Sequence, residues 1–156
     1  MEKLDSLNQV AEFHKTFKHP IEKDPVIPEK SRCDLRVALL AEELKELQEA
    51  INDNDIVEIA DALCDLQYVL SGAVLEFGLG DKFRELFDEV QRSNMSKACD
   101  TEEEAKSTVD YYKEKKNEEC YYKQVDGRYL VFRKSDNKTI KSVNYSPADL
   151  KKILDK

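Results

Sequence analysis

The sequence predicts an all-α fold, with a four-helix-bundle core followed by a small C-terminal β-hairpin module and a terminal helix. Apolar residues recur at helical spacing through most of the first hundred positions, which indicates amphipathic helices. Only four glycines and four prolines occur in 156 residues, and 37% of the residues are charged. Such a composition is typical of helical proteins with well-solvated outer faces.

The first two predicted helices are separated by an irregular segment. Residues 4–17 carry apolar side chains at helical spacing, and Pro20, Pro25 and Pro28 follow. Because proline removes a backbone donor and breaks helices, this segment cannot be helical throughout. The second helix is predicted from about residue 29 to about residue 50, where leucines form one stripe.

The third helix is predicted to lie beside the second one. The run Asn52 to Asp55 breaks the second helix, and Asp55 with Glu58 forms a capping box that opens a third helix to about Phe77. A connection this short makes consecutive helices antiparallel neighbours. Gly78 and Gly80 end the third helix, and a fourth is predicted from about Asp81.

The C-terminal part combines a helix with a hairpin. A capping box at Thr101 predicts a polar helix to about residue 116, and Asp126-Gly127 lies between two aromatic segments, which is a strong hairpin signal. A turn at residues 135–137 suggests a third strand. Residues 146–149 predict the start of the terminal helix. We therefore expect one domain, with residues 1–100 as the core and residues 101–156 packed on it.

Composition restricts the functional class. No apolar run approaches the ~20 residues of a membrane span, so we expect a cytoplasmic protein that does not bind membranes. A net charge of −8 argues against general nucleic-acid binding. The four cysteines lack zinc-ligand spacing, and the two histidines carry no functional prediction.

The third predicted helix carries an unusual group of acids. It is apolar around most of its circumference, yet Glu58, Asp61 and Asp65 lie within a narrow arc. Buried carboxylates are rare unless they are paired. No lysine or arginine occurs between Leu47 and Asp81, so no nearby base compensates these charges.

The second predicted helix supplies a matching acidic group. Counting outward from the connecting turn at ~1.5 Å per residue places Glu46 level with Asp61 and Glu43 level with Asp65. Carboxylates that converge from two neighbouring helices repel one another unless a cation lies between them. Their oxygen ligands suit Mg²⁺, with Mn²⁺ as a possible substitute.

A structural interpretation of the same residues remains open. Glu58 has a place in the capping box, Asp65 can lie on a solvated face, and acids are ordinary on helix surfaces. The set as a whole favours a metal site. The competing hypothesis is a non-catalytic helical interaction module whose acidic face binds a basic partner or water.

The acidic segments also resemble a known family. Glu42-Glu43-Leu44-Lys45-Glu46 and Glu58-Ile59-Ala60-Asp61 are similar to the EExxE and ExxD signature of the MazG-like all-α nucleoside triphosphate pyrophosphohydrolases. That superfamily includes dimeric dUTPases and phosphoribosyl-ATP pyrophosphohydrolases. Further resemblance lies in Glu12-Phe13-His14, in Arg36 and in the segment Ser93 to Lys97.

The resemblance implies a reaction and roles for individual residues. It implies Mg²⁺-dependent hydrolysis of a nucleoside triphosphate to the monophosphate and pyrophosphate. Glu43, Glu46, Glu58 and Asp61 would bind the metal, and Glu42 would activate water, although the division between ligand and base stays open. The alternative substrate within the superfamily is phosphoribosyl-ATP, and the family also implies a homodimer or homotetramer.

Four further residues are expected to contact the substrate. They are Arg36, Asp65, Asn94 and Lys97. For Asn94 and Lys97 the alternative is a structural role at a helix C-terminus. Six basic residues within 120–145 either help to bind a triphosphate or form a solvated hairpin.

Overall fold

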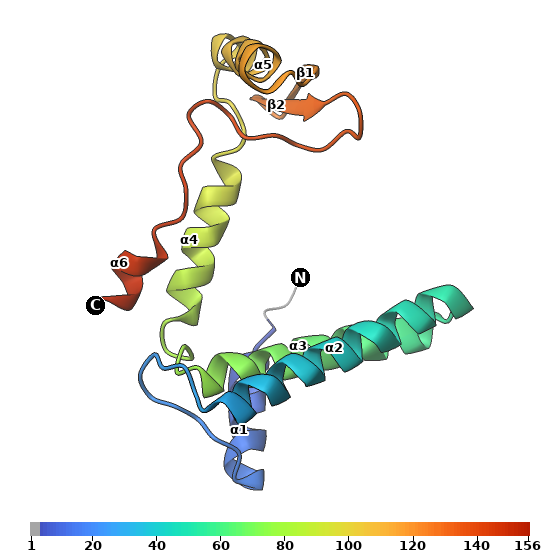
Figure 1. The fold of residues 1–156 in the computed structure, drawn as a ribbon, viewed down its shortest axis with the longest axis vertical. Helices are drawn as coiled ribbons and strands as arrows, with labels where there is room; N and C mark the ends of the chain where they lie inside the picture. Colours follow the sequence, from blue (N-terminus) through green and yellow to red (C-terminus); the bar gives the residue numbers. More distant parts are fainter. Residues whose placement is uncertain (1–3) are drawn as a thin grey trace. The chain divides into compact units, whose positions relative to one another are not determined.

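The structure is a computed structural model and describes residues 4–156. The chain divides into two compact units, Met1–Arg84 and Glu85–Lys156. The helices are α1 (Ser6–Phe17), α2 (Lys30–Asp53), α3 (Ile56–Glu76), α4 (Phe83–Met95), α5 (Glu102–Lys116) and α6 (Leu150–Leu154), and the strands are β1 (Cys120–Val125) and β2 (Arg128–Arg133) (Figure 1). The predicted helical fold class, hairpin and terminal helix are confirmed. The predicted division at residue 100 within one domain stays a prediction.

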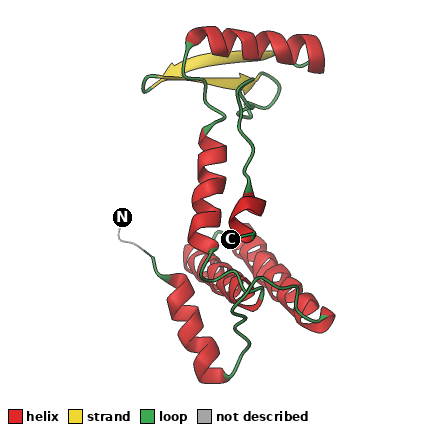
Figure 2. Ribbon diagram, turned by 90° about the vertical axis from the view of Figure 1, so that its left-hand side faces the viewer, coloured by secondary structure: helices red, strands yellow, loops and turns green. Residues whose placement is uncertain are grey.

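The first unit is built around the antiparallel pair of α2 and α3. The two helices lie side by side along their length, and α1 packs against α3 (Figures 1 and 2). The turn between them is as short as predicted, because Asn54 adopts a left-handed conformation with a φ of 56°. The Asp55 side chain then accepts hydrogen bonds from the amides of Val57 and Glu58, which caps α3.

The second unit has a small core between α5 and the hairpin. Its buried members are Cys99, Ala105, Cys120, Val131 and Ile140. Figure 2 shows α5 lying over the two-stranded sheet. The predicted cap at Thr101 is present, since its hydroxyl accepts from the Glu104 amide at 3.1 Å. All four cysteines of the chain are free thiols.

The hairpin forms at the predicted turn. Asp126 and Gly127 both have positive φ angles, 48° and 81°, as a two-residue hairpin turn of the I′ type requires. The suggested third strand does not form within residues 4–156, where the segment after β2 contributes one isolated bridge between Phe132 and Thr139. The sheet therefore has two strands.

The terminal helix begins later than the sequence suggests. We expected Pro147 at its first position, but α6 starts at Leu150 and Asp149 caps it by accepting from the Lys152 amide. The reason lies in α4, because Arg92 donates to the Ser146 hydroxyl and to the Pro147 carbonyl. These contacts hold the segment extended ahead of the helix.

The described helices carry no candidate membrane span. None of them combines the length and the apolar character that crossing a bilayer requires. This finding agrees with the absence of a long apolar run in the sequence.

Candidate functional site: two ends of one helix pair

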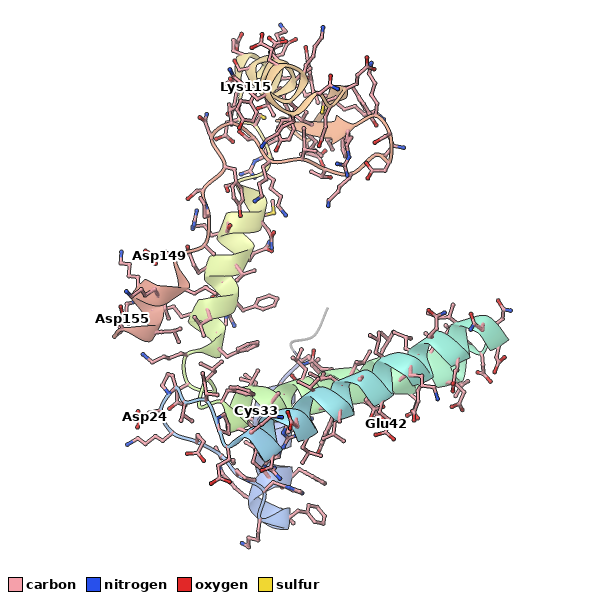
Figure 3. All side chains as sticks on the ribbon, viewed as in Figure 1. Asp24, Cys33, Glu42, Lys115, Asp149 and Asp155 are labelled. Atoms are coloured by element: carbon pink, nitrogen blue, oxygen red, sulfur yellow. The ribbon has the colours of Figure 1, made fainter. Side chains whose placement is uncertain are left out.

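The predicted carboxylate cluster lies in the half of the α2–α3 pair that is nearer the connecting turn. Glu42, Glu43 and Glu46 belong to α2, and Asp61 and Asp65 belong to α3. Figure 3 shows Glu42 part-way along α2. Glu58 lies one turn before Asp61, in the first turn of α3, and its side chain is exposed.

Glu43 lies among the other carboxylates of this cluster. Partial burial raises its pKa above the ordinary value, and the negative charges around it raise the pKa further. In decreasing order, these charges belong to Asp65, Glu46, Glu42 and Asp61. Since Asp65 and Asp61 are on the facing helix, the two acidic groups lie within electrostatic range across the pair.

The lysine between the acids of α2 is paired elsewhere. Lys45 is directed to Glu49, with its ammonium 3.2 Å from that carboxylate, and both side chains are largely exposed. An all-oxygen donor set without a basic partner fits the preferences of Mg²⁺. Within residues 4–156, no three acidic, histidine or cysteine side chains converge closely enough to hold a metal ion as they stand. Binding would therefore need side-chain rotation toward the ion.

The opposite end of the helix pair holds a different kind of glutamate. Glu76, at the end of α3, has a side chain that is only 1% exposed. Arg36 and Arg32 of α2 both form ion pairs with it, and the Arg32 Nε donates to its Oε2 at 3.1 Å. Burial alone would raise the pKa of Glu76, but the hydrogen bonds from the two arginines outweigh burial and lower it.

His14 of α1 completes this buried network. Its Nδ1 lies 2.8 Å from the Pro20 carbonyl, which can only accept, so Nδ1 carries the proton. Its Nε2 then accepts from the Arg36 Nη2 at 3.4 Å. Burial lowers the pKa of His14, consistent with a neutral ring. Gly72 makes room for the contact, since a Cβ there would lie 2.8 Å from the Arg36 Nη1.

A cavity of about 240 Å³ opens beside this network, between α1, α2 and α3. Polar side chains line part of its wall, and they are His14, His19, Arg32 and Arg36. Aromatic rings line another part, namely Phe13 of α1 and Tyr68 of α3. The predicted substrate residue Arg36 is therefore at a cavity, but it is engaged with Glu76 and His14.

Comparison with known proteins identifies the family. A family model described as phosphoribosyl-ATP pyrophosphohydrolase matches residues 10–94, which is more than half of the chain. The chain belongs to this family. The match begins within α1 and contains the acidic residues of α2 and α3 and almost all of α4. Membership in the phosphoribosyl-ATP pyrophosphohydrolase family, part of the MazG-like all-α superfamily, implies a nucleotide pyrophosphohydrolase-type activity.

One relative extends over the whole chain. An uncharacterized protein of Acanthamoeba polyphaga mimivirus is 24% identical, with 99% of this chain and 97% of that protein covered. Because that protein is itself uncharacterized, it adds no information on the substrate. The hairpin module lies beyond the part that matches the phosphoribosyl-ATP pyrophosphohydrolase model.

The two other predicted substrate residues lie in the second unit. The Lys97 ammonium donates to the Asn94 Oδ1 at 2.8 Å, at the C-terminal end of α4. The Lys97 carbonyl also accepts from the Ser142 amide. The contact between the two side chains fits both of the interpretations that the sequence left open, so their role in this member of the family stays a prediction.

Sequence reasoning missed Glu76, Arg32 and His14, although a signal for the first two was available. Arg32 lies 21 residues before the end of α2, and Glu76 lies 20 residues after the start of α3. The count of residues from the connecting turn, which placed Glu43 level with Asp65, therefore also places Arg32 level with Glu76. His14 carried no comparable signal, because its place depends on how α1 packs.

Proposed function

We propose that this member of the phosphoribosyl-ATP pyrophosphohydrolase family hydrolyses a nucleoside or deoxynucleoside triphosphate to the monophosphate and pyrophosphate, in a Mg²⁺-dependent reaction that serves nucleotide-pool housekeeping. The observation that carries the proposal is the group of uncompensated carboxylates on the facing sides of α2 and α3 around Glu43. Buried structural carboxylates are normally paired, as Glu76 is. Uncompensated ones in a pyrophosphohydrolase family are expected to bind a cation.

The proposed roles follow the motif positions. Glu43, Glu46, Glu58 and Asp61 would hold the ion. Bound Mg²⁺ would neutralise phosphate charge, with Mn²⁺ as a substitute. Glu42 would accept a proton from the attacking water while the α–β phosphoanhydride bond breaks. If water attacks the α phosphorus, its oxygen ends in the monophosphate and pyrophosphate leaves; if it attacks the β phosphorus, its oxygen ends in pyrophosphate and the monophosphate leaves.

Substrate contacts are proposed for four residues. Arg36, Asn94 and Lys97 lie in segments that resemble the family, and Asp65 belongs to the acidic group of α3. Lys97 would contact phosphate as a point charge, and Asn94 would contact phosphate or base. The exposed acids of the cluster would be drawn together by the ion and the substrate.

Phosphoribosyl-ATP is the second candidate substrate. The description of the matching family model favours it. The reaction is again hydrolysis of an α–β phosphoanhydride, so the same carboxylates would serve both substrates. The additional C-terminal module of residues 101–156, which lies beyond the family match, is our reason for ranking phosphoribosyl-ATP below ordinary triphosphates.

The active form is proposed to be a homodimer or homotetramer. In the part of the chain that the structure describes, α2 and α3 expose large apolar side chains, among them Val37 at 68%, Leu44 at 59% and Ile56 at 73%. A second copy that covers these side chains would complete a four-helix core across a two-fold interface. Light scattering at micromolar concentration tests this assembly, and a monomer would contradict it.

The reaction is tested by a substrate screen. All common ribonucleoside and deoxyribonucleoside triphosphates and phosphoribosyl-ATP are incubated with Mg²⁺, and pyrophosphate and orthophosphate are measured separately. We expect pyrophosphate and the monophosphate in equal amounts, with no turnover in EDTA. Release of orthophosphate, or no turnover of any substrate with Mg²⁺ or Mn²⁺, would contradict the proposal.

The alternative of a non-catalytic interaction module is tested by metal binding. A ligand that binds only the folded state raises the melting temperature. Millimolar Mg²⁺ should therefore stabilise a true carboxylate site. An unchanged melting temperature together with absent turnover would favour the interaction module.

A further inference from the structure

The cavity between α1, α2 and α3 has an aromatic rim. The Phe13 and His19 rings are nearly parallel, with centroids 5.7 Å apart and an interplanar angle of 9°. The Tyr68 ring meets Phe13 edge-on at 5.6 Å. Phe13 and Tyr68 are 36% and 40% exposed, so these rings are accessible where the cavity opens. Partly exposed rings grouped at a cavity are suited to contact another flat ring.

The polar wall of the cavity offers hydrogen-bond donors with a fixed geometry. Arg32 uses its Nε and Nη2 to bind Glu76, which leaves its Nη1 for a ligand. The Arg32 side chain is 31% exposed, whereas Glu76 is buried. Because a bidentate contact orients a guanidinium, the buried glutamate holds Arg32 in place at the cavity. Two arginines and one glutamate give this wall a net positive charge.

The cavity follows the carboxylate cluster along the same face of the helix pair. Leu39, which lines the cavity, is four residues before Glu43 on α2. Tyr68 is three residues after Asp65 on α3. Side chains three or four residues apart share a helix face, so the cavity begins about one helical turn, ~5.4 Å, from the cluster. A ligand with phosphates at the cluster extends its other end toward the cavity.

The cavity is large enough for only part of a nucleotide. Its volume of about 240 Å³ is below the ~300–1,000 Å³ of pockets that enclose whole drug-sized ligands. One flat ring system therefore fits better than a complete nucleoside triphosphate. The rings of Phe13 and Tyr68 supply stacking surface, and the arginine wall requires an acceptor on the ligand.

We propose that this cavity binds the nucleobase of the substrate, and that Arg32, held by Glu76, donates a hydrogen bond to a ring carbonyl of that base. The inference rests on the proposed function in taking a nucleotide as the ligand. The substrate class is then a nucleotide whose base bears a carbonyl, meaning uracil, thymine, cytosine or guanine. Adenine offers ring nitrogens as acceptors but no carbonyl oxygen, so a donor placed for a carbonyl oxygen finds no acceptor at the same position, and AMP should bind more weakly.

The first test measures binding of nucleoside monophosphates to the full chain in EDTA, by titration calorimetry and NMR. UMP, CMP and GMP are expected to bind at least about tenfold more tightly than AMP. Tyr68→Leu keeps an apolar side chain but removes the ring, and it should weaken UMP binding by about fivefold or more. Phe17→Leu is the matched control, because Phe17 is an exposed α1 ring that contacts Phe13 without lining the cavity. It should bind UMP as the parent does.

The second test isolates the hydrogen bond. Arg32→Lys keeps the positive charge but removes the planar guanidinium with its fixed N–H donors. It should reduce the preference for UMP over AMP while leaving AMP binding nearly unchanged. Arg92→Lys is the control. Arg92 forms a comparable ion pair with Glu89, but it belongs to the second unit, whereas the cavity residues belong to the first. Circular dichroism and light scattering confirm that each variant keeps the fold and assembly of the parent.

The outcomes separate this inference from the proposed function. In turnover assays, Tyr68→Leu should raise the KM for the preferred triphosphate with little change in kcat, while inhibition by inorganic tripolyphosphate, which has no base, stays the same. Unchanged UMP binding in Tyr68→Leu, or equal binding of AMP and UMP by the parent, overturns the inference even if hydrolysis is observed. Selective UMP binding that Tyr68→Leu abolishes supports the inference even if no triphosphate is hydrolysed, in which case the proposed function alone fails.

Discussion

Glu76 and Glu43 lie in the same helix pair but in opposite surroundings. Glu76 is buried beneath two arginines, and its pKa is lowered. Roughly three helical turns further along the pair, Glu43 faces other carboxylates, and its pKa is raised. The fold therefore compensates the charge of one glutamate and leaves a group of others uncompensated, a difference that supports the proposed metal site.

The exposure of the two ends fits this distinction. The Glu76 end is the better-packed part of the first unit, where Ser71, Ala73, Val74 and Leu75 are buried. Near the connecting turn, by contrast, Ile56 and Val57 are more than 70% exposed. The Glu76 end is therefore the better-packed end of the helix pair, and the exposed end is where we propose that metal, substrate and a second copy bind.

The largest effect is expected from Glu76→Gln. Removing one partner from a buried ion pair leaves uncompensated charge, in this case on Arg36 and Arg32, which typically costs about 3–5 kcal/mol. Urea unfolding without metal measures the loss. The control is Glu49→Gln, which breaks an exposed pair with Lys45 and should cost at most about 0.5 kcal/mol. Equal free energies of unfolding for the two variants would contradict the difference that we describe between the two ends of the helix pair.

An intermediate effect is expected from acidification of the buried network. His14 has a lowered pKa in the fold, so below the unfolded-state value of about 6.5 the unfolded chain binds a proton that the folded chain does not. Stability is therefore lost as the pH falls from about 6.5 toward the folded-state pKa, with a slope of at most about 1.4 kcal/mol per pH unit for this one group. His14→Asn keeps a donor for the Pro20 carbonyl but cannot titrate. Melting temperatures at a series of pH values should fall less steeply for this variant, and identical slopes would contradict the account.

The smallest effect is expected at the carboxylate cluster without metal. Glu43→Gln removes one charge from a mutually repelling group, so the metal-free fold should be as stable as the parent or slightly more stable. Added NaCl should stabilise the parent more than the variant, because salt screens exposed like charges. Melting temperatures at about 0.02 M and about 0.5 M NaCl test this. A clear loss of stability in Glu43→Gln would mean that the cluster is structural.

Local signals predicted the positions of the helix pair and the hairpin. The break at Asn54-Asp55 fixed α2 and α3 as neighbours, and Asp126-Gly127 fixed the hairpin turn, since each depends on a few residues near in sequence. The facing of Glu43 and Asp65 followed from counting along these helices. The same count applied to Glu76 would have found its arginine partners.

Contacts between distant segments were beyond such reasoning. The cavity requires the position of α1, which a segment with three prolines connects to α2, and periodicity does not define the path of that segment. The start of α6 depended on Arg92, more than fifty residues earlier. Local capping rules placed the helix start at Pro147, and the long-range contact shifted it to Leu150.

The most direct measurement of the central claim uses Glu46→Gln, which keeps the size of the side chain and removes one charge from the cluster. Mg²⁺-dependent pyrophosphate release and metal-free melting are measured on the same preparation, with Glu49→Gln as the control on the same helix. We predict a fall of at least about tenfold in turnover, weaker stabilisation by Mg²⁺, and a metal-free melting temperature equal to or above that of the parent. A variant that remains fully active while its metal-free fold is destabilised would contradict the assignment of these carboxylates to a metal-dependent site.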